Sequence, residues 1–321
     1  MRSQPQECCQ VKVIQTPEER FANLSDYPFA PNYAAIPDLD GGTLRMHYID
    51  EGPKDAPPIV MIHGNPSWSY LWRNIIPPVV AAGNRVIAID LVGLGRSDKP
   101  TEMSDFTVAR HVEWARSALI DVLDLKEITL VLHDWGGVVG LRILHHHPDR
   151  IARVCITNSG IFLRDPAEPM PEKIEPAGPF ADFQKMVRET PDWPHWEMLR
   201  ALCSVKLSQE VVDGYHAPYP SPEYMCGNRQ FTQLLATTPD NPQLPDNWEA
   251  WQTIKQFDRP MLTIMSTGDQ VTKGSEKRFI AEVPGCAGQP HVILEGGNHF
   301  LQEDLREELL GELLPWLEAT K

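Results

Sequence analysis

The chain has 321 residues, 42% hydrophobic and 23% charged, which suffices for one large α/β domain with an insertion and excludes fibrous and disordered classes. The formal net charge of −15 disfavours nucleic acid and anionic membrane surfaces as partners, so a small molecule is expected. Residues 1–16 hold no signal-peptide core, and no run approaches the roughly 20 apolar residues of a membrane span. We therefore expect a cytoplasmic protein.

The arm before about residue 42 is rich in Pro, Tyr and Phe and lacks periodicity. It is expected to wrap the core irregularly, with room for one strand. Alternating or continuous apolar patterns then predict strands over 44–49, 58–62 and 85–89, separated by helical patterns.

The next elements follow the same alternation. Apolar spacing predicts a helix over 107–123, β-branched runs predict strands over 128–132 and 152–157, and a helix begins after Asp134. Alternating strands and helices indicate an α/β fold with a mostly parallel, doubly wound sheet.

The alternation breaks after Asn158. Residues 161–228 are rich in proline, and helical patterns appear at 180–188, 196–202 and 209–215 without a convincing strand. Strands are again predicted over 261–265 and 291–294, and the chain closes on an amphipathic helix over 305–317. We expect a core domain formed by 1–158 and 229–321, with a helical cap, 159–228, inserted after the sixth core strand.

The six cysteines lack the spacing of a zinc site or a disulfide framework, so reduced thiols are expected. They are Cys8, Cys9, Cys155, Cys203, Cys226 and Cys286. The run His145-His146-His147 resembles a metal-binding tract, but it ends a predicted helix, where histidine complements the helix dipole. Adjacent residues also cannot share one helical face, so no metal is expected.

Asp134 follows the buried strand 128–132 and precedes Gly136 and Gly137, which permit a tight turn into a helix. This places a carboxylate at the tip of a strand-to-helix turn, where hydrolases of the α/β type carry their nucleophile. An ordinary helix N-cap aspartate is an equal alternative on these residues alone.

Two partners favour catalysis. Asp269 follows strand 261–265, and His299 lies in the loop after strand 291–294. Each residue alone fits a simple turn or loop. The order nucleophile, acid, histidine at successive strand ends instead predicts a catalytic triad.

An aspartate nucleophile implies a covalent ester. A carboxylate can displace a leaving group from a tetrahedral carbon without prior deprotonation. His299, oriented by Asp269, would then activate water to hydrolyse the ester on Asp134. The backbone N–H groups of Asn65 and Trp135 are the expected oxyanion donors. Without Asp134, the segment His63-Gly64-Asn65-Pro66 would be interpreted as an ordinary turn.

Over nearly its whole length the chain resembles the haloalkane dehalogenases of the α/β-hydrolase superfamily. The matching segments are Thr16 to Phe21, Tyr27 to Pro31, Leu44 to Gly52, His63 to Tyr70, Asp90 to Pro100, His133 to Gly137, and Gly297 to Phe300. The resemblance implies hydrolysis of a carbon–halide bond, with a small halogenated hydrocarbon and water as substrates, halide as a product and no cofactor. A monomer is expected, with an oligomer left open.

The resemblance also implies that the indole N–H of Trp135 holds the departing halide, which suits a donor-only group. Relatives with a similar arm usually carry Glu where Asn65 stands and use a cap Trp as second donor, whereas the aligned cap residue here is Phe183. Another branch uses this Asn but places its acid where this chain has Asn158. We predict Asn65 and Trp135 as the halide pair, with a cap Trp as the alternative. The candidate pocket residues are Phe183, Trp193, Trp196 and Phe300.

Two other functions stay open. An epoxide hydrolase uses the same kind of nucleophile and needs cap tyrosines to protonate the epoxide oxygen, for which Tyr215, Tyr219 and Tyr224 are candidates, although packing explains them equally well. A hydrolase-like binding protein without activity is the third possibility, and an intact triad argues against it.

Overall fold

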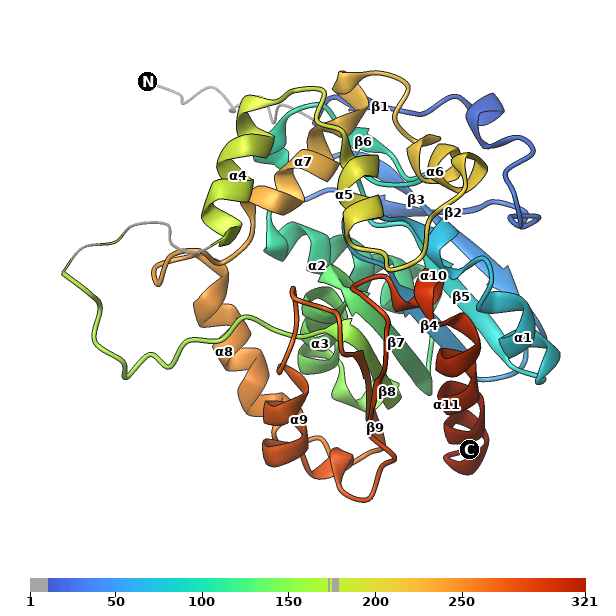
Figure 1. The fold of residues 1–321 in the computed structure, drawn as a ribbon, viewed down its shortest axis with the longest axis vertical. Helices are drawn as coiled ribbons and strands as arrows, with labels where there is room; N and C mark the ends of the chain where they lie inside the picture. The colour runs from blue at the N-terminus through green and yellow to red at the C-terminus, as the bar shows by residue number, and fades with distance from the viewer. Residues whose placement is uncertain (1–10, 173, 175–178) are drawn as a thin grey trace, which may run out of the picture.

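The structure is a computed structural model that describes residues 11–172, 174 and 179–321. Figure 1 shows a central sheet with helices on both faces and a group of helices above one end of its strands. Cys155, Cys203, Cys226 and Cys286 are free thiols, while Cys8 and Cys9 lie outside the described residues. Within the described part of the chain, no helix is both long and apolar enough to span a membrane.

The central sheet has eight strands in the order β10-β9-β8-β7-β4-β5-β3-β2. The six neighbouring strands β10, β9, β8, β7, β4 and β5 pair in parallel, whereas β3 pairs antiparallel with both β5 and β2. This confirms the predicted mostly parallel sheet. The strands are β2 (Asn32–Pro37), β3 (Thr43–Glu51), β4 (Pro58–Ile62), β5 (Arg85–Ile89), β7 (Ile128–Asp134), β8 (Ile151–Ser159), β9 (Met261–Ser266) and β10 (Val292–Leu294).

Helices cover both faces of the sheet, so the sheet is doubly wound. One face packs against α2 (Val108–Arg116), α3 (Trp135–His146), α8 (Gln243–Ile254) and α9 (Glu276–Glu282). The other face packs against α1 (Ile76–Ala81) and α11 (Arg306–Ala319). The short helix α10 (Leu301–Asp304) precedes α11.

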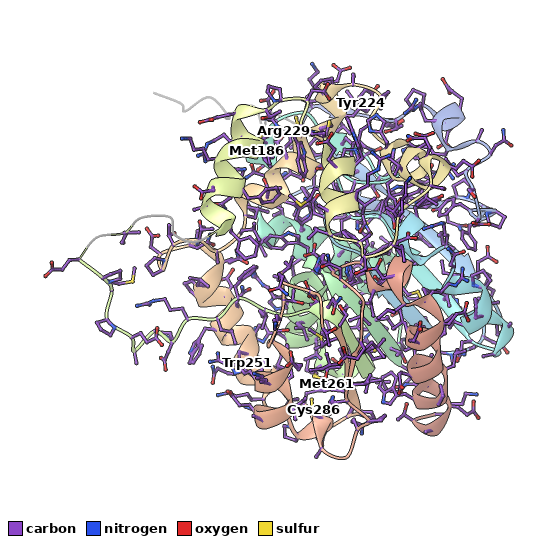
Figure 2. All side chains as sticks on the ribbon, viewed as in Figure 1. Met186, Tyr224, Arg229, Trp251, Met261 and Cys286 are labelled. Carbon is purple, nitrogen blue, oxygen red and sulfur yellow. The ribbon has the colours of Figure 1, made fainter. Side chains whose placement is uncertain are left out.

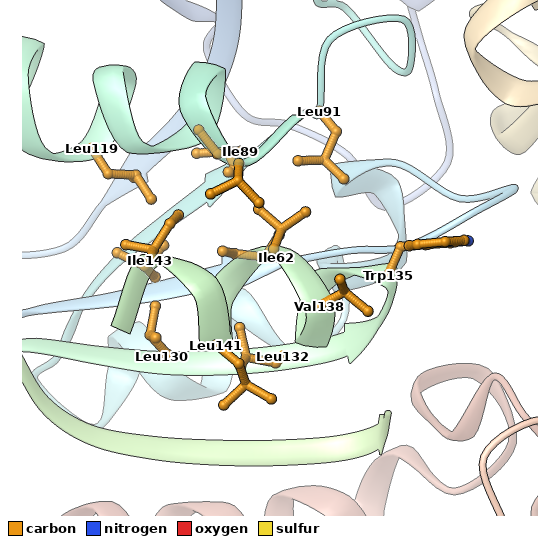
Figure 3. Close-up of a cluster of buried hydrophobic side chains, with 14 of the residues drawn as sticks. Ile62, Ile89, Leu91, Leu119, Leu130, Leu132, Trp135, Val138, Leu141 and Ile143 are labelled. Carbon is orange, nitrogen blue, oxygen red and sulfur yellow. The ribbon is translucent and has the colours of Figure 1, made fainter. Parts of the chain in front are cut away.

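Strand β4 explains why the sheet is buried on both sides. All five of its residues are buried, and successive side chains of a strand point to opposite faces. Val60 and Ile62 therefore join the hydrophobic cluster on the α3 side, whereas Ile59 and Met61 join the cluster on the α11 side. Figure 3 shows the first cluster between strands and α3, with the Trp135 ring at its edge, pointing away from it.

Two segments differ from the sequence prediction. The arm contains β1 (Val13–Ile14), which pairs with an unpredicted strand, β6 (Lys99–Pro100). The helix predicted over 107–123 ends at Arg116 and continues as a π-helical turn over Ser117–Val122. Four consecutive residues of this turn, 117–120, are buried, a pattern that the single apolar stripe of a regular surface helix does not provide.

Four helices, most of them in the stretch expected to form the cap, lie above the carboxyl ends of the parallel strands (Figure 1). They are α4 (Pro179–Glu189), α5 (His195–Ala201), α6 (Gln209–His216) and α7 (Cys226–Gln233). Tyr224 and Arg229 belong to this upper part of the molecule, far from Trp251 and Met261 (Figure 2). No strand occurs among the described residues between β8 and β9. Helix α7 crosses the expected domain boundary at residue 228 and packs on α4.

Candidate active site

Asp134 lies where β7 passes directly into α3. Its backbone has φ 50° and ψ −124°, a conformation that non-glycine residues rarely adopt and that is common at functional sites. Gly136 makes the turn sterically feasible, because a Cβ there would lie 2.1 Å from the carbonyl oxygen of Ile62. Asp134 occupies the N-cap position of α3, but its side chain makes no helix-capping hydrogen bond, so capping does not account for a carboxylate here.

The three residues predicted to form a triad lie together at the carboxyl ends of the strands. His299 Nε2 is 3.3 Å from Asp134 Oδ2, and His299 Nδ1 is 3.0 Å from Asp269 Oδ1. The side chains of His299 and Asp269 are buried, and that of Asp134 is 13% exposed. The imidazole therefore connects two carboxylates, and Asp134 and His299 both line a cavity under the cap helices.

Asp269 is held by the loop that follows it. The backbone N–H of Val271 donates to Asp269 Oδ1 at 2.8 Å, and the Thr272 hydroxyl donates to Oδ2. Burial raises the pKa of Asp269, but hydrogen bonds from His299 and Thr272 outweigh it and lower the pKa to about 2. Sequence reasoning missed Thr272, although a Thr three residues after an Asp is a familiar local turn pattern.

The charges of the triad stabilise one another. Burial disfavours the imidazolium of His299, yet hydrogen bonds to Asp134 and Asp269 raise its pKa to about 9. Burial likewise disfavours the carboxylate of Asp134, while the bond from His299 and the backbone N–H of Trp135 hold its pKa below the usual value. The nucleophile candidate is thus ionised at neutral pH.

Both expected oxyanion donors contact Asp134. The backbone N–H of Asn65 donates to Asp134 Oδ1 at 2.8 Å, and the backbone N–H of Trp135 also hydrogen-bonds this carboxylate. Because β4 and β7 are neighbours in the sheet, the loop after β4 meets the end of β7 directly. This arrangement fits the stabilisation of an oxyanion that forms on Asp134.

Asn158, at the end of β8, does not take the place of the acid. Its Nδ2 lies 2.9 Å from the carbonyl oxygens of both Asn298 and His299, and its Oδ1 accepts from the Ser266 N–H at 2.9 Å. The amide therefore holds the backbone of the histidine loop against β9, a role that sequence reasoning did not identify.

Two cavities meet at Asp134 and Trp135. The first, here called the aromatic cavity, has a volume of about 230 Å³ and lies under the cap. Its lining residues are Asn65, Pro66, Asp134, Trp135, Phe180, Phe183, Trp193, Met198, Leu202, Thr232, Leu235, Val271 and His299. The second, about 340 Å³, opens between residues 160–162 and 271–275.

The four candidate pocket residues separate into two pairs. Phe183 and Trp193 line the aromatic cavity, as predicted. Trp196 and Phe300 line neither of these cavities, which corrects the prediction. The Trp196 ring packs against His195 and His216, and the Phe300 ring lies behind His133 and His299.

The tyrosines considered for an epoxide hydrolase do not line the aromatic cavity either. The Tyr215 hydroxyl donates to Glu303 Oε1 at 2.5 Å, and Tyr219 is buried with its ring 4.9 Å from that of His195. Tyr224 lies at the top of the cap (Figure 2). None of the three is in a position to protonate an oxygen held above Asp134.

The chain is similar to known proteins over most of its length. The family model described as the alpha/beta hydrolase fold matches residues 57–304. The haloalkane dehalogenase of Psychrobacter cryohalolentis is 42% identical over 307 residues, which cover 96% of this chain and 98% of the relative. That of Mycolicibacterium paratuberculosis is 40% identical over 96% of this chain and 99% of its own.

The chain belongs to the haloalkane dehalogenase family. Among solved structures, haloalkane dehalogenase DpaA from Paraglaciecola agarilytica, described as tetrameric, superimposes with a TM-score of 0.82 and 30% identity. The match covers 96% of this chain and 99% of DpaA, so the similarity to this haloalkane dehalogenase extends over the cap as well as the sheet.

Proposed function

We propose that this protein hydrolyses haloalkanes to an alcohol, a halide ion and a proton, with Asp134 as nucleophile. The observation that carries the proposal is the ionised Asp134 carboxylate at the floor of the aromatic cavity, 3.3 Å from His299 Nε2 and 2.8 Å from the Asn65 N–H. A carboxylate in this position can attack carbon, and the histidine can later activate water.

In the first step, a carboxylate oxygen of Asp134 attacks the carbon that bears the halogen. The new carbon–oxygen bond forms as the carbon–halogen bond breaks, and its electron pair leaves with the halide. The mostly apolar lining of the cavity lowers the local polarity and strengthens hydrogen bonds to the departing anion.

We assign halide binding to the indole N–H of Trp135 and the side-chain amide of Asn65. Both residues line the aromatic cavity, and the side-chain oxygen of Asn65 is buried without a hydrogen-bond partner within the described residues, so no neighbouring donor there holds this amide. Trp193, in contrast, donates its indole N–H to Asn228 Oδ1 at 3.1 Å and is 1% exposed. Phe183 has no donor. Among the described cap residues that line the aromatic cavity, none therefore offers an unbonded indole N–H.

In the second step, His299 takes a proton from water, and the resulting hydroxide attacks the carbonyl carbon of the Asp134 ester. The N–H groups of Asn65 and Trp135 stabilise the oxyanion. Collapse of this intermediate breaks the bond between the carbonyl carbon and the alkyl oxygen and releases the alcohol. His299, held by Asp269, passes the first proton of the water to the alkoxide. The second proton, left on the Asp134 carboxyl group, goes to solvent.

Isotopic labelling tests this route. In a single turnover in H₂¹⁸O with enzyme in excess, we expect the label in Asp134 and none in the first equivalent of alcohol. Mass spectrometry of the peptide and of the product checks both. The variant Asp134→Asn is the control and should release no halide from bromoalkanes. Label in the first equivalent of alcohol would exclude the ester.

We further propose the division into a core, 1–158 and 229–321, and an inserted cap, 159–228, with the cap packing extended by α7. A monomer in the cytoplasm that needs no cofactor remains our prediction.

A further inference from the structure

The peptide group between Gly64 and Asn65 supplies one of the oxyanion donors, and neighbouring side chains hydrogen-bond to its carbonyl oxygen. Its N–H belongs to Asn65 and points at Asp134 Oδ1, 2.8 Å away. Its carbonyl belongs to Gly64. In a planar trans peptide, the N–H and the C=O point in opposite directions, so fixing the carbonyl fixes the direction of the N–H.

Two buried side chains donate to the Gly64 carbonyl. His63 Nδ1 lies 2.7 Å from this oxygen, and the Ser67 hydroxyl donates to it at 3.0 Å. Both side chains are fully buried. Gly64 itself approaches the nucleophile so closely that a Cβ there would lie 2.0 Å from Asp134 Oδ1, so only glycine fits at this position.

The tautomer of His63 is set by a third group. The backbone N–H of Leu91, just beyond β5, donates to His63 Nε2 at 3.0 Å, so Nε2 is the acceptor. Nδ1 must then carry the proton and donate to the Gly64 carbonyl. Burial lowers the pKa of His63, which keeps the ring neutral and this tautomer in place.

We propose that His63 and Ser67 are positioning residues that aim the Asn65 N–H at the oxyanion formed on Asp134. A hydrogen bond to a peptide carbonyl also polarises the peptide and strengthens its N–H as a donor. This assignment rests on the proposed function. It predicts a larger effect on ester hydrolysis than on ester formation, because the oxyanion forms when water attacks the ester and not when Asp134 attacks the haloalkane.

Rapid-quench kinetics with a bromoalkane separates the two steps, since bromide release reports ester formation and alcohol release reports ester hydrolysis. In His63→Gln the side-chain amide replaces Nε2, but the Gly64 carbonyl loses the donor that Nδ1 provided and keeps only the Ser67 hydroxyl. We expect alcohol release to slow by about 10- to 100-fold, with bromide release changed by less than about 3-fold. The alkyl-enzyme should accumulate and be visible by mass spectrometry.

Matched variants separate positioning from general damage. His63→Asn carries an amide donor near the position of Nδ1, and we expect it to restore most of the hydrolysis rate. Ser67→Ala removes one donor and should slow hydrolysis by about 3- to 10-fold. Ser117→Ala is its control, because Ser117 is equally buried but has no hydrogen-bond partner within the described chain.

The outcomes are distinguishable. Equal slowing of both steps in His63→Gln and Ser67→Ala, or unchanged hydrolysis in either folded variant, would overturn the assignment while leaving the proposed function intact. If His63→Gln does not fold, Ser67→Ala decides by the same criterion. A wild-type enzyme that releases bromide without ever forming an ester on Asp134 would refute the covalent route, and the positioning assignment with it.

Discussion

His299 changes its protonation during the proposed cycle because the charge beside it changes. In the free enzyme two carboxylates raise its pKa to about 9, and a protonated imidazole cannot act as a base. Once Asp134 becomes an ester, one of these charges is gone, while burial continues to favour the neutral ring. Formation of the ester thus prepares the base that hydrolyses it, and Asp269 keeps the ring oriented throughout.

The halide donors give a prediction at single residues. Asn65→Ala keeps the backbone N–H of the oxyanion site but removes the side-chain amide. We therefore expect the inhibition constant of bromide to rise by about 10-fold or more. Trp193→Phe should change the inhibition constant by less than about 3-fold, since its indole N–H is already bonded to Asn228. Inhibition by added bromide measures both. The reverse pattern would identify a cap Trp as the second donor.

The amino-terminal arm fastens the cap to the core. The Thr16 hydroxyl donates to the Pro218 carbonyl at 2.7 Å, and Arg20 Nε donates to the Ala217 carbonyl at 3.2 Å. Ala217 is the C-cap of α6, and the last carbonyls of a helix lack partners within the helix. The arm supplies the missing donors, and a cation at this helix end is also electrostatically favourable.

This contact predicts a loss of stability. In Thr16→Val the side-chain volume is kept but the buried Pro218 carbonyl loses its donor, so we expect the free energy of unfolding to fall by about 1–2 kcal/mol. Thr101→Val is the matched control, because the Thr101 hydroxyl is buried without a partner in the described structure and should be replaced at no cost. Urea unfolding measures both. Equal effects would show that the arm contact contributes nothing.

Elements differ in how far the sequence predicts them. The strand at 128–132 and the turn at Asp134 are predictable because a buried parallel strand is a continuous apolar run. The pairing of β1 with β6 is not, since two-residue strands carry no periodic pattern. The sequence also does not show that the Trp193 indole N–H is already hydrogen-bonded, because its partner Asn228 lies 35 residues away, on α7. Trp196 is of a residue type that often lines pockets, but its ring packs against two histidines instead, which the sequence does not show.

For the whole molecule, the triad predicts how stability depends on pH. The folded pKa of Asp269 lies below its ordinary 3.8, so its contribution is present above that pH and is lost as pH falls toward about 2. The folded pKa of His299 lies above its ordinary 6.5, so its contribution is full below pH 6.5 and is lost as pH rises through about 9.

Thermal unfolding tests this dependence. Between pH 6.5 and 9, we expect the melting temperature of the wild type to fall more steeply than that of His299→Gln, which has no proton to lose there. The corresponding difference in the free energy of unfolding is about a few kcal/mol at most, because burial offsets part of the interaction. Parallel curves for the two proteins would show that His299 is not held as an imidazolium in the free enzyme.

The hydrogen bonds that hold Asp134, Asp269 and His299 in the described structure all come from the sheet and its adjoining loops. The helices α4, α5 and α7 line the aromatic cavity through Phe183, Met198 and Thr232. The catalytic residues therefore come from the core, whereas much of the apolar cavity lining comes from the cap helices and the segments beside them. Substitutions in the cap residues that line the cavity can therefore change which halogenated compounds fit, while the catalytic residues stay the same.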